Sequence, residues 1–582
     1  MRSFDGTSIV THFYPASRAP AGGRAATVLV GSGFPHRGDT RPDLDASDQI
    51  GAATLRRAGY NVLTWDPRGL GGSGGTVMFD SADHEARDVA SLIDFVARQP
   101  EALLDAAGDP RVGMSGRSYG AGIQLVSAAI DPRIDAIVPD LAWHSLVTSF
   151  FKDGAVKAGW LTLVCGGGEV AALTGGLFFT PGGLQLGGTA TEMKRACLEA
   201  IAGGAISAAS RRWIADRGPG DLVDRIRAPT LIVQGTVDPL FSLDEAIANY
   251  ERLRSNGVPV KMVWYCGGHG ACPTPVREPR RVARAALAWL DRWLKRSGAI
   301  DTGPAFEWIA DDGIWRAAPD FPLAPAGALA GVGAGKLSIL PLAGVDARLI
   351  APPVPTRRAA DVRFSAARVA GDVVGAPRVK LTYHGTAVPA RTLLYAQVVD
   401  AVHGRVAGAQ VTPLPVVLDG RTRTVERPLE TLALRVGPAS DLRLQITAGT
   451  TVYGPQRSLG NVRLRSIEAS LPLVDGARAG RASNAGAGLR TPRRLRISPS
   501  SRRVRGRSRI VLRSRLRTRP CSGTVGFTIR AGSTRRTARA TIAPTCAVRA
   551  VVRLRAPAGR TARIAARFEG NQQLAPRRAR SV

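Results

Sequence analysis

Short apolar runs rich in β-branched residues alternate with amphipathic segments over roughly the first half of the chain. The runs have the length of buried strands and lie at 25–30, 60–65, 112–115, 134–140, 228–235 and 259–265. Helical patterns separate several of them; in Asp83–Gln99, for example, Val89, Leu92, Ile93 and Val96 share one face. This alternation predicts an α/β fold class, a doubly wound domain that we place at residues 1–298.

The alternation stops after Trp143 and resumes at Ala228. The intervening segment, about 144–226, carries helical and Gly-rich pieces with several aromatic residues. In an α/β enzyme such an insertion usually covers the active site. We therefore expect a helical cap; a subdomain with only a packing role is the alternative.

Strand-like alternation with a period of two takes over beyond Arg296. It predicts an all-β sandwich over residues 299–474, whose first clear strand begins at Arg378. A Gly-, Ala- and Arg-rich linker follows at 475–490. Residues 491–582 alternate again, which indicates a second, small β-sandwich. Its last predicted strand, near Phe568, is similar to that of bacterial Ig-like modules.

The net charge of +33 is concentrated in the C-terminal segment. Residues 481–582 hold 27 arginines and one acid, Glu569, whereas the first 480 residues carry 52 basic and 45 acidic groups. An arginine-rich face predicts binding to an acidic surface polymer, and a merely solvated face is the alternative. Because few aromatic residues are interleaved, no specific nucleic acid is expected as a partner.

The six cysteines fall into near pairs, and no C-x-x-C pattern occurs. The pairs are Cys165 with Cys197, Cys266 with Cys272, and Cys521 with Cys546. Such pairs favour disulfides and an extracellular location. The N-terminus shows no signal-peptide pattern, so we expect either a cytoplasmic protein or a chain that lacks its true N-terminus. No apolar run is long enough for a membrane span.

One glycine-rich turn has the pattern and the context of a nucleophilic serine. Gly-Arg-Ser-Tyr-Gly at 116–120 follows a strand and precedes a helical run, which makes Ser118 the candidate nucleophile. Small residues two before and two after the serine let strand and helix cross closely. The string Gly-Gly-Ser-Gly-Gly at 71–75 also matches but no helix follows it, so we interpret it as a loop.

Asp238 and His269 complete a candidate catalytic triad. Each follows a predicted strand, as Ser118 does, and ligands in open α/β sheets bind at those strand ends. The order serine, aspartate, histidine is that of α/β-hydrolases. His269 would act as general base toward the serine, and Asp238 would orient and stabilise the imidazolium. A loop histidine and a turn aspartate are the alternatives for these two residues.

Further site residues follow from this placement. The backbone N–H of Tyr119 is the first candidate oxyanion-hole donor, and that of Phe34 or, alternatively, Gly33 is the second. His36, Trp143 and His144 follow strands and are candidates for lining the pocket. No metal cluster, phosphate loop or dinucleotide fingerprint is present, so neither a metal nor another cofactor is expected.

The chain resembles the X-Pro dipeptidyl-peptidase and cocaine esterase family of serine hydrolases. The resemblance spans residues 3 to about 472 and rests on the segments at 3–7, 65–69, 116–120, 234–241 and 267–270. It implies the triad Ser118, Asp238 and His269, and a jelly-roll domain after the hydrolase. The family supplies its second oxyanion donor from a tyrosine hydroxyl, where this chain has Phe34.

These observations predict an enzyme that hydrolyses a small-molecule or peptide substrate through an acyl-enzyme. An X-Pro dipeptidyl-peptidase is the first hypothesis and a carboxylic ester hydrolase the second. A dipeptidyl-peptidase needs an acid to hold the substrate amine, for which Glu169, Glu192 and Asp140 are candidates. A third hypothesis is a non-catalytic protein that binds surfaces through its basic tail.

Overall fold

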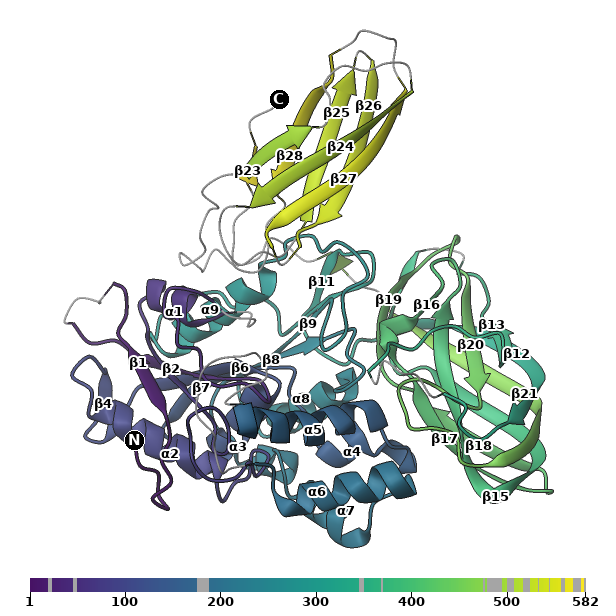
Figure 1. The fold of residues 1–582 in the computed structure, drawn as a ribbon, viewed down its shortest axis with the longest axis horizontal. Coiled ribbons are helices and arrows are strands. Elements are labelled where there is room, and N and C mark those ends of the chain that lie inside the picture. The colour runs from purple at the N-terminus through teal and green to yellow at the C-terminus, as the bar shows by residue number, and fades with distance from the viewer. Residues whose placement is uncertain are drawn as a thin grey trace.

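The computed structural model shows three lobes (Figure 1). It describes residues 1–18, 23–45, 50–174, 188–344, 350–367, 370–474, 477–478, 495–499, 507–516, 524–531, 533–543, 545–555, 561–568 and 577–579. Most of the linker predicted at 475–490 lies outside these residues, as do Phe178, Phe179 and Cys521. Within the described part of the chain, no helix has the length and apolar character needed to cross a membrane.

The first lobe is built on one ten-stranded sheet. Its order is β1 (Thr11–Tyr14), β3 (Asn61–Trp65), β2 (Thr27–Gly31), β6 (Val112–Arg117), β7 (Ile134–Asp140), β8 (Thr230–Gly235), β9 (Val260–Tyr265), β10 (Phe306–Ile309), β11 (Trp315–Ala318) and β22 (Ala477–Arg478). The strands from β3 to β10 pair in parallel, and β1 and β11 pair antiparallel near the two edges. A small hairpin, β4 (Leu104–Ala106) and β5 (Asp109–Pro110), lies outside this sheet.

Helices cover both faces of this sheet. The core on one face includes side chains of α2 (Glu85–Ala97), α3 (Tyr119–Ile130) and α8 (Leu243–Ser255). The core on the other face includes α1 (Ala52–Arg57) and α9 (Arg281–Trp293). The predicted α/β fold class, a hydrolase domain followed by β-sheet domains, is confirmed.

The hydrolase sheet extends beyond residue 298, where the sequence analysis ends this domain. Strands β10 and β11 continue the sheet, and β22 returns to it from the predicted linker. The sequence pattern does not reveal these short strands, because β10 has only four residues and β22 two, too few to show a period.

The cap predicted at about 144–226 is helical where it is described. It contains α4 (Leu146–Phe150), α5 (Ala158–Thr174), α6 (Thr191–Leu198), α7 (Ala208–Ala215) and short helical turns at Lys152–Gly154, Glu199–Gly203 and Gly220–Arg225. A disulfide between Cys165 and Cys197 joins α5 to α6. One apolar cluster spans cap and hydrolase and includes Tyr119, Trp160 and Phe241.

The second lobe is an antiparallel β-sandwich. Its strands are β12 (Pro325–Ile339), β13 (Ala359–Arg363), β14 (Gly371–Gly375), β15 (Arg378–Asp400), β16 (Arg405–Val406), β17 (Thr412–Asp419), β18 (Arg423–Pro428), β19 (Leu432–Val436), β20 (Leu442–Thr447) and β21 (Leu459–Val474), with a helical turn at Ala407–Ala409. Strands β12 to β14 were not predicted; in β12, Ala and Gly fill much of the strand where β-branched residues would mark one.

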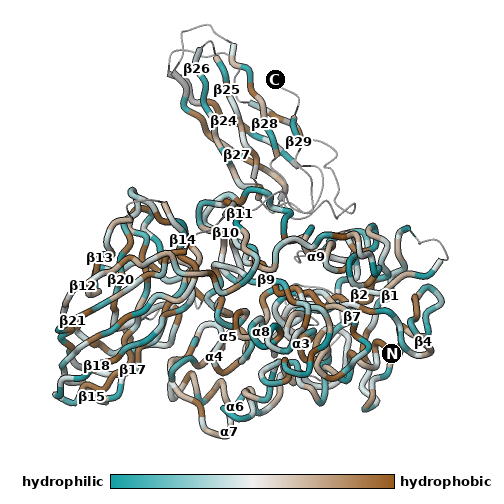
Figure 2. The backbone as a smooth tube through the Cα atoms, turned by 180° about the vertical axis from the view of Figure 1, so that it is seen from behind, coloured by the Kyte–Doolittle hydropathy of each residue, from teal (hydrophilic) through white to brown (hydrophobic). Residues whose placement is uncertain are grey.

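The third lobe is a small β-sandwich that stands apart in both views (Figures 1 and 2). One sheet has the order β23 (Leu495–Pro499), β24 (Arg507–Leu516), β27 (Ala547–Arg555); the other has β26 (Thr534–Thr541), β25 (Thr524–Ala531), β28 (Arg563–Phe568), β29 (Arg577–Arg578). We call this lobe the arginine module. Its core is apolar, and Cys546 is disulfide-bonded.

Candidate active site

Ser118 stands at the sharp turn between β6 and α3. Its φ is +56°, a left-handed conformation that an L-residue adopts only under local constraint. A Cβ at Gly120 would collide with the Gly31 carbonyl, and one at Gly116 would lie 2.5 Å from the same oxygen. The G-x-S-x-G string therefore exists because β2, β6 and α3 cross without room for side chains. The second such string folds as a loop, in which Ser73 is buried and donates to the Asp66 carbonyl.

The structure brings Ser118, His269 and Asp238 into one hydrogen-bonded chain. His269 Nε2 lies 3.1 Å from Ser118 Oγ, and His269 Nδ1 lies 2.7 Å from Asp238 Oδ2. Asp238 is fully buried, and its Oδ1 accepts the N–H groups of Leu240 and Phe241 at 2.9 and 2.8 Å. These contacts fix the carboxylate behind the imidazole, as general-base activation of a serine requires.

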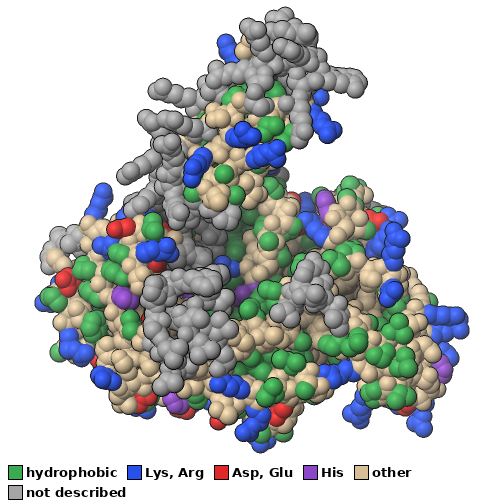
Figure 3. Space-filling model, in the orientation of Figure 1, with side chains coloured by type: hydrophobic (Ala, Val, Ile, Leu, Met, Phe, Trp, Pro, Cys, Tyr) green, Lys and Arg blue, Asp and Glu red, His purple; other side chains and the backbone are tan. Residues whose placement is uncertain are grey.

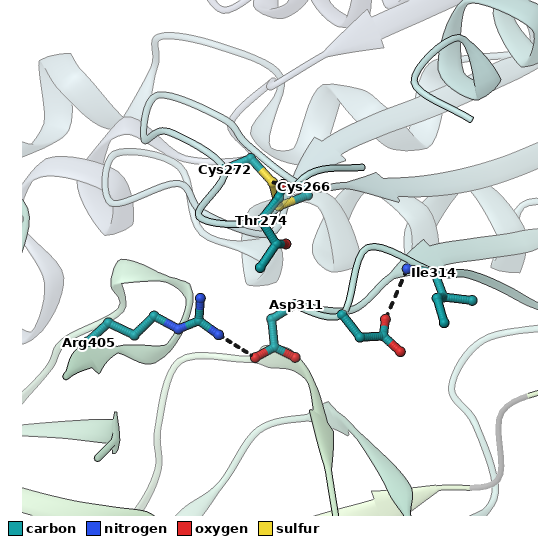
Figure 4. Close-up of a disulfide and its surroundings, with 7 residues drawn as sticks. Cys266, Cys272, Thr274, Asp311, Ile314 and Arg405 are labelled. Atoms are coloured by element: carbon teal, nitrogen blue, oxygen red, sulfur yellow. Dashed lines mark hydrogen bonds and ion pairs between the residues drawn. A yellow bond between two sulfur atoms is a disulfide. The ribbon is translucent and has the colours of Figure 1, made fainter. Parts of the chain in front are cut away.

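The loop that carries His269 is held from several sides. The guanidinium of Arg117 donates to the Gly268 carbonyl at 2.6 Å. Gly268 lies against Asp238, where a Cβ would approach the aspartate Cβ to 2.8 Å. The Cys266–Cys272 disulfide closes the same loop (Figure 4). The predicted pairings of Cys165 with Cys197 and of Cys266 with Cys272 are thus confirmed.

Aromatic rings surround the imidazole. The Trp160 and Phe241 rings meet the His269 ring edge to face, with centroids 5.6 and 5.2 Å away. The Phe34 ring packs against the Tyr119 ring, with the two centroids 5.8 Å apart. Trp160 comes from the cap, where the sequence gives no signal of a role at the site. The space beside the candidate nucleophile is therefore bordered by apolar rings.

The two candidate oxyanion donors lie on the expected elements. Tyr119 is the first residue of α3, so its N–H lies at the N-terminal end of a helix, which favours negative charge. Gly33 and Phe34 lie in the loop after β2, and a Cβ at Gly33 would be 4.0 Å from that of Ser118. The Phe34 side chain joins the aromatic cluster with Tyr119 and Phe79.

The three candidate pocket residues have different surroundings. Trp143 is buried and packs against Phe241, so one ring separates it from His269. His144 Nδ1 lies 2.9 Å from Asn249 Oδ1, on α8. His36 is exposed in the loop after β2.

Two buried acids lie behind Tyr119. The Tyr119 hydroxyl donates to Glu85 Oε1 at 3.3 Å, and burial raises the pKa of Glu85 to about 7. Burial also raises the pKa of Asp80 well above its ordinary range. Both acids follow β3 in sequence, yet only the tertiary structure shows that they share this buried position.

The β-sandwich contacts the candidate triad directly. The Gln410 amide donates to the Asp238 carbonyl at 2.8 Å. From the cap, buried Lys157 donates to the Leu240 carbonyl at 2.9 Å, next to the N–H that binds Asp238. Burial lowers the pKa of Lys157. Neither contact was foreseen from the sequence, because the three segments are far apart along the chain.

A charged cluster joins the β-sandwich to the hydrolase nearby. Lys152 Nζ lies 2.7 Å from Glu430 Oε1 and 4.0 Å from Asp244 Oδ2. Burial and, after it, the neighbouring Glu430 carboxylate raise the pKa of Asp244 to about 8. Burial opposes the ionisation of Glu430 as well. The nearby Lys152 ammonium is the main effect that outweighs burial, and it holds the pKa of Glu430 below its ordinary range.

A cleft of about 600 Å³ also separates these two lobes. It is lined by Val237, Cys266, Asp311, Arg405 and Arg435, among others. In Figure 4 the Asp311–Arg405 ion pair, at 2.7 Å, faces the Cys266–Cys272 disulfide across this region. The cleft lies behind the loops that carry Asp238 and His269.

Comparison with known proteins agrees with this arrangement. Residues 5–271 match the family model for X-Pro dipeptidyl-peptidase (S15 family). This part of the chain is similar to members of that family. The X-Pro dipeptidyl-peptidase family members are hydrolases, so the chain is a serine hydrolase, and the hypothesis of a non-catalytic binding protein is not supported. No curated protein matches the chain in sequence.

Several solved structures share the fold of this chain. An aminopeptidase from a marine sediment archaeon of the Thaumarchaeota has 13% identity and a TM-score of 0.59, over 81% of this chain and 95% of its own. An α-amino acid ester hydrolase has 14% identity and a TM-score of 0.60, over 81% and 95%. A CocE/NonD family hydrolase from Staphylococcus aureus has 13% identity and a TM-score of 0.57, over 82% and 92%.

Proposed function

We propose that Ser118, His269 and Asp238 form the catalytic triad of an acyl-transfer enzyme. The unbroken chain of hydrogen bonds from Ser118 Oγ through the imidazole to Asp238 carries this proposal. Ser118 Oγ attacks the substrate carbonyl while its proton passes to His269 Nε2. The imidazolium then returns that proton to the leaving group, which departs and leaves an acyl-enzyme. Water, deprotonated by His269, releases the acid and restores Ser118.

The N–H groups of Tyr119 and Phe34 are the proposed oxyanion donors. Tyr119 precedes the rest of α3, and Phe34 stands where the resembled family has a tyrosine hydroxyl. A backbone donor from this loop is the usual second member of the hole in α/β-hydrolases. Phe34 therefore supplies a ring to the pocket wall and its N–H to the oxyanion.

The pocket walls favour an ester with an apolar acyl group as the substrate. The rings of Trp160 and Phe241 border His269, and an ester needs no charged anchor for its acyl part. Of the acids that could hold a substrate amine, Glu192 is exposed on α6 and Asp140 is buried at the end of β7. The side chain of Glu169 lies outside the described residues. An X-Pro dipeptidyl-peptidase is the second candidate, supported by the family match over residues 5–271.

The test compares a p-nitrophenyl butyrate ester with a Gly-Pro p-nitroanilide, each with the wild type and with Ser118→Ala. We expect ester turnover that falls at least about 10⁴-fold in Ser118→Ala. Anilide turnover equal to that of the ester would replace the esterase proposal by the peptidase. A fluorophosphonate probe gives a readout independent of substrate: labelling at Ser73, or none at Ser118, would contradict the triad.

Phe34→Tyr tests the oxyanion assignment. If the backbone N–H of Phe34 already completes the hole, an added hydroxyl changes kcat by less than about threefold. Phe79→Tyr is the matched control, since Phe79 packs against Phe34 in the same cluster. A rise in kcat of about 100-fold in Phe34→Tyr alone would mean that the hole lacks its second donor.

The acidic polymer predicted for the arginine-rich tail is a separate proposal. It involves none of the residues of the hydrolase site. The two proposals therefore stand or fall independently.

A further inference from the structure

The sheet β26-β25-β28-β29 of the arginine module has one buried face and one arginine-covered face. Val525, Phe527 and Ile529 of β25 point into the module core. The alternate positions of β25 and their partners in the neighbouring strands form the outer face. Six exposed arginines lie on it: Arg530, Arg535, Arg539, Arg563, Arg567 and Arg578. We call this set the arginine platform.

The register orders the platform into two rows. Arg530 of β25 lies directly opposite Arg535 of β26 and Arg563 of β28, so three guanidinium-bearing residues stand side by side across three strands. Neighbours within such a row are about 5 Å apart, and four residues along a strand advance about 13 Å. The second row therefore lies about 13 Å away.

The second row encloses a floor of small side chains. Gly526 pairs with Arg539 on one side and with Arg567 on the other, and Arg567 in turn pairs with Arg578. Between the two rows lie Thr528, Thr537 and Ala565. Thr528 pairs with Thr537 on one side and with Ala565 on the other. The platform is therefore two rows of positive charge with a low, hydroxyl-bearing strip between them.

Positioning like charges directly opposite each other costs stability, and the sequence of residues 481–582 supplies almost no acid to offset it. Such cross-strand pairs are destabilising. Residues 481–582 contain a single acid, Glu569, against 27 arginines. A general preference for arginine does not explain this, because the first 480 residues balance 52 basic groups with 45 acidic ones. On the face shown in Figure 3, the charged side chains drawn in colour on this lobe are basic.

We propose that the arginine platform binds an acidic polysaccharide. Guanidinium groups pair bidentately with carboxylate and sulfate groups, and two rows can hold successive acidic groups of one chain. The Thr528 and Thr537 hydroxyls offer hydrogen bonds to a sugar backbone lying on the strip. Single-stranded nucleic acid fits poorly, since base stacking needs exposed aromatic rings and Phe527 and Phe568, the two aromatic residues of the segment, are buried.

This inference adds a binding function to the hydrolase. The platform lies in a lobe apart from the hydrolase (Figure 1), so binding would hold the enzyme at a polyanionic surface and leave the active site open. It therefore predicts that binding and turnover of a soluble substrate are independent.

The test measures binding of the full chain to heparin and to polygalacturonate, with and without a triple substitution of the platform. Arg530→Ser, Arg535→Ser and Arg563→Ser together remove one row. The matched control is Arg513→Ser, Arg549→Ser and Arg553→Ser, which removes three exposed arginines from the other sheet of the same module. Both variants lose the same charge, so a difference between them reports the site and not the net charge.

We expect the platform variant to raise the Kd for both polysaccharides about 10-fold or more, and the control by less than about threefold. Hydrolysis of a soluble ester should be unchanged in both, which verifies folding. Equal weakening in the two variants would overturn the proposal, because the platform would then bind no better than the other sheet, where Arg513 also lies opposite Arg549. Failure of the wild type to bind either polysaccharide at low salt, or tighter binding of a 20-nucleotide oligo-dT, would also overturn it.

Discussion

The β-sandwich and the arginine module are built from the same kind of strand but relate to charge in opposite ways. The β-sandwich places its ionisable groups against the hydrolase, where Glu430 meets Lys152 and Arg405 meets Asp311. The module instead aligns arginine against arginine, as at Arg530 and Arg563. An element that serves the fold of the enzyme thus has its charges matched within the chain. The arginine module instead places like charges side by side, and we propose that its partner lies outside the chain.

The largest effect should come from breaking the matched charges. Lys152→Met removes the ammonium from Glu430 and Asp244 and leaves a buried negative charge without its partner. We expect the free energy of unfolding, measured with guanidinium chloride, to fall by about 3–5 kcal/mol.

The double variant Lys152→Met/Glu430→Gln is the control for this prediction. It removes both charges and should recover at least half of the loss. If Lys152→Met lowers the free energy of unfolding by less than about 1 kcal/mol, the charged cluster of Lys152, Glu430 and Asp244 does not hold the two lobes together.

Acid titration should separate the hydrolase from the module. Burial raises the pKa of Glu85 from 4.5 to about 7, so the folded state keeps a proton that the unfolded state releases above pH 4.5. The contribution of Glu85 to stability is therefore fully present below pH 4.5 and falls by about 3 kcal/mol as the pH rises from 4.5 through 7. The difference between wild type and Glu85→Gln, followed by denaturant unfolding from pH 4.5 to 8, should show this slope.

The arginine module supplies the contrast for the Glu85 experiment. Arginine does not titrate in this range, so the module transition should not move with pH. A wild type and a Glu85→Gln variant with parallel pH profiles would show that Glu85 does not hold its proton in the folded state.

A smaller effect, on turnover, should follow from removing the sandwich contact with the candidate triad. Gln410→Ala deletes the donor to the Asp238 carbonyl and lets the aspartate shift. We expect kcat for the ester to fall about 10-fold with KM unchanged, as expected for a positioning residue.

Gln397→Ala is the matched control for Gln410→Ala. Gln397 is another buried glutamine of the sandwich, and it donates to Gln445 at 2.9 Å, away from the triad. The Gln397→Ala variant should have a lower free energy of unfolding but keep its kcat within about twofold of the wild-type value. Equal losses of kcat in the two variants would mean that the sandwich acts only through stability.

The sequence predicted the parts of the site that depend on local constraints. The serine turn needs glycines on both sides of Ser118, and strand ends must carry Asp238 and His269, so spacing and strand order were sufficient to bring these residues into one hypothesis. The α/β fold class followed from the same alternation of strands and helices.

The remaining features of the site arise from contacts that spacing does not encode. Gln410 reaches Asp238 across 172 residues, and Trp160 reaches His269 from a helix whose pattern predicted only a cap. Strands β10 and β22 were missed for another reason: they are too short to show a period and are stabilised by an existing sheet edge.

The smallest expected effect has the opposite sign to the others. Arg530→Thr removes the central arginine of a row of three and replaces it by a residue that favours strands. We expect the module to gain about 0.2–1 kcal/mol of stability at low salt, measured by calorimetry of the full chain. The gain should shrink in 0.5 M salt, because screening already weakens the repulsion. With heparin bound, the wild-type module should become more stable than that of Arg530→Thr, since heparin stabilises the wild type more than the variant. A loss of stability in Arg530→Thr at low salt would show that the arginines support the module without any partner.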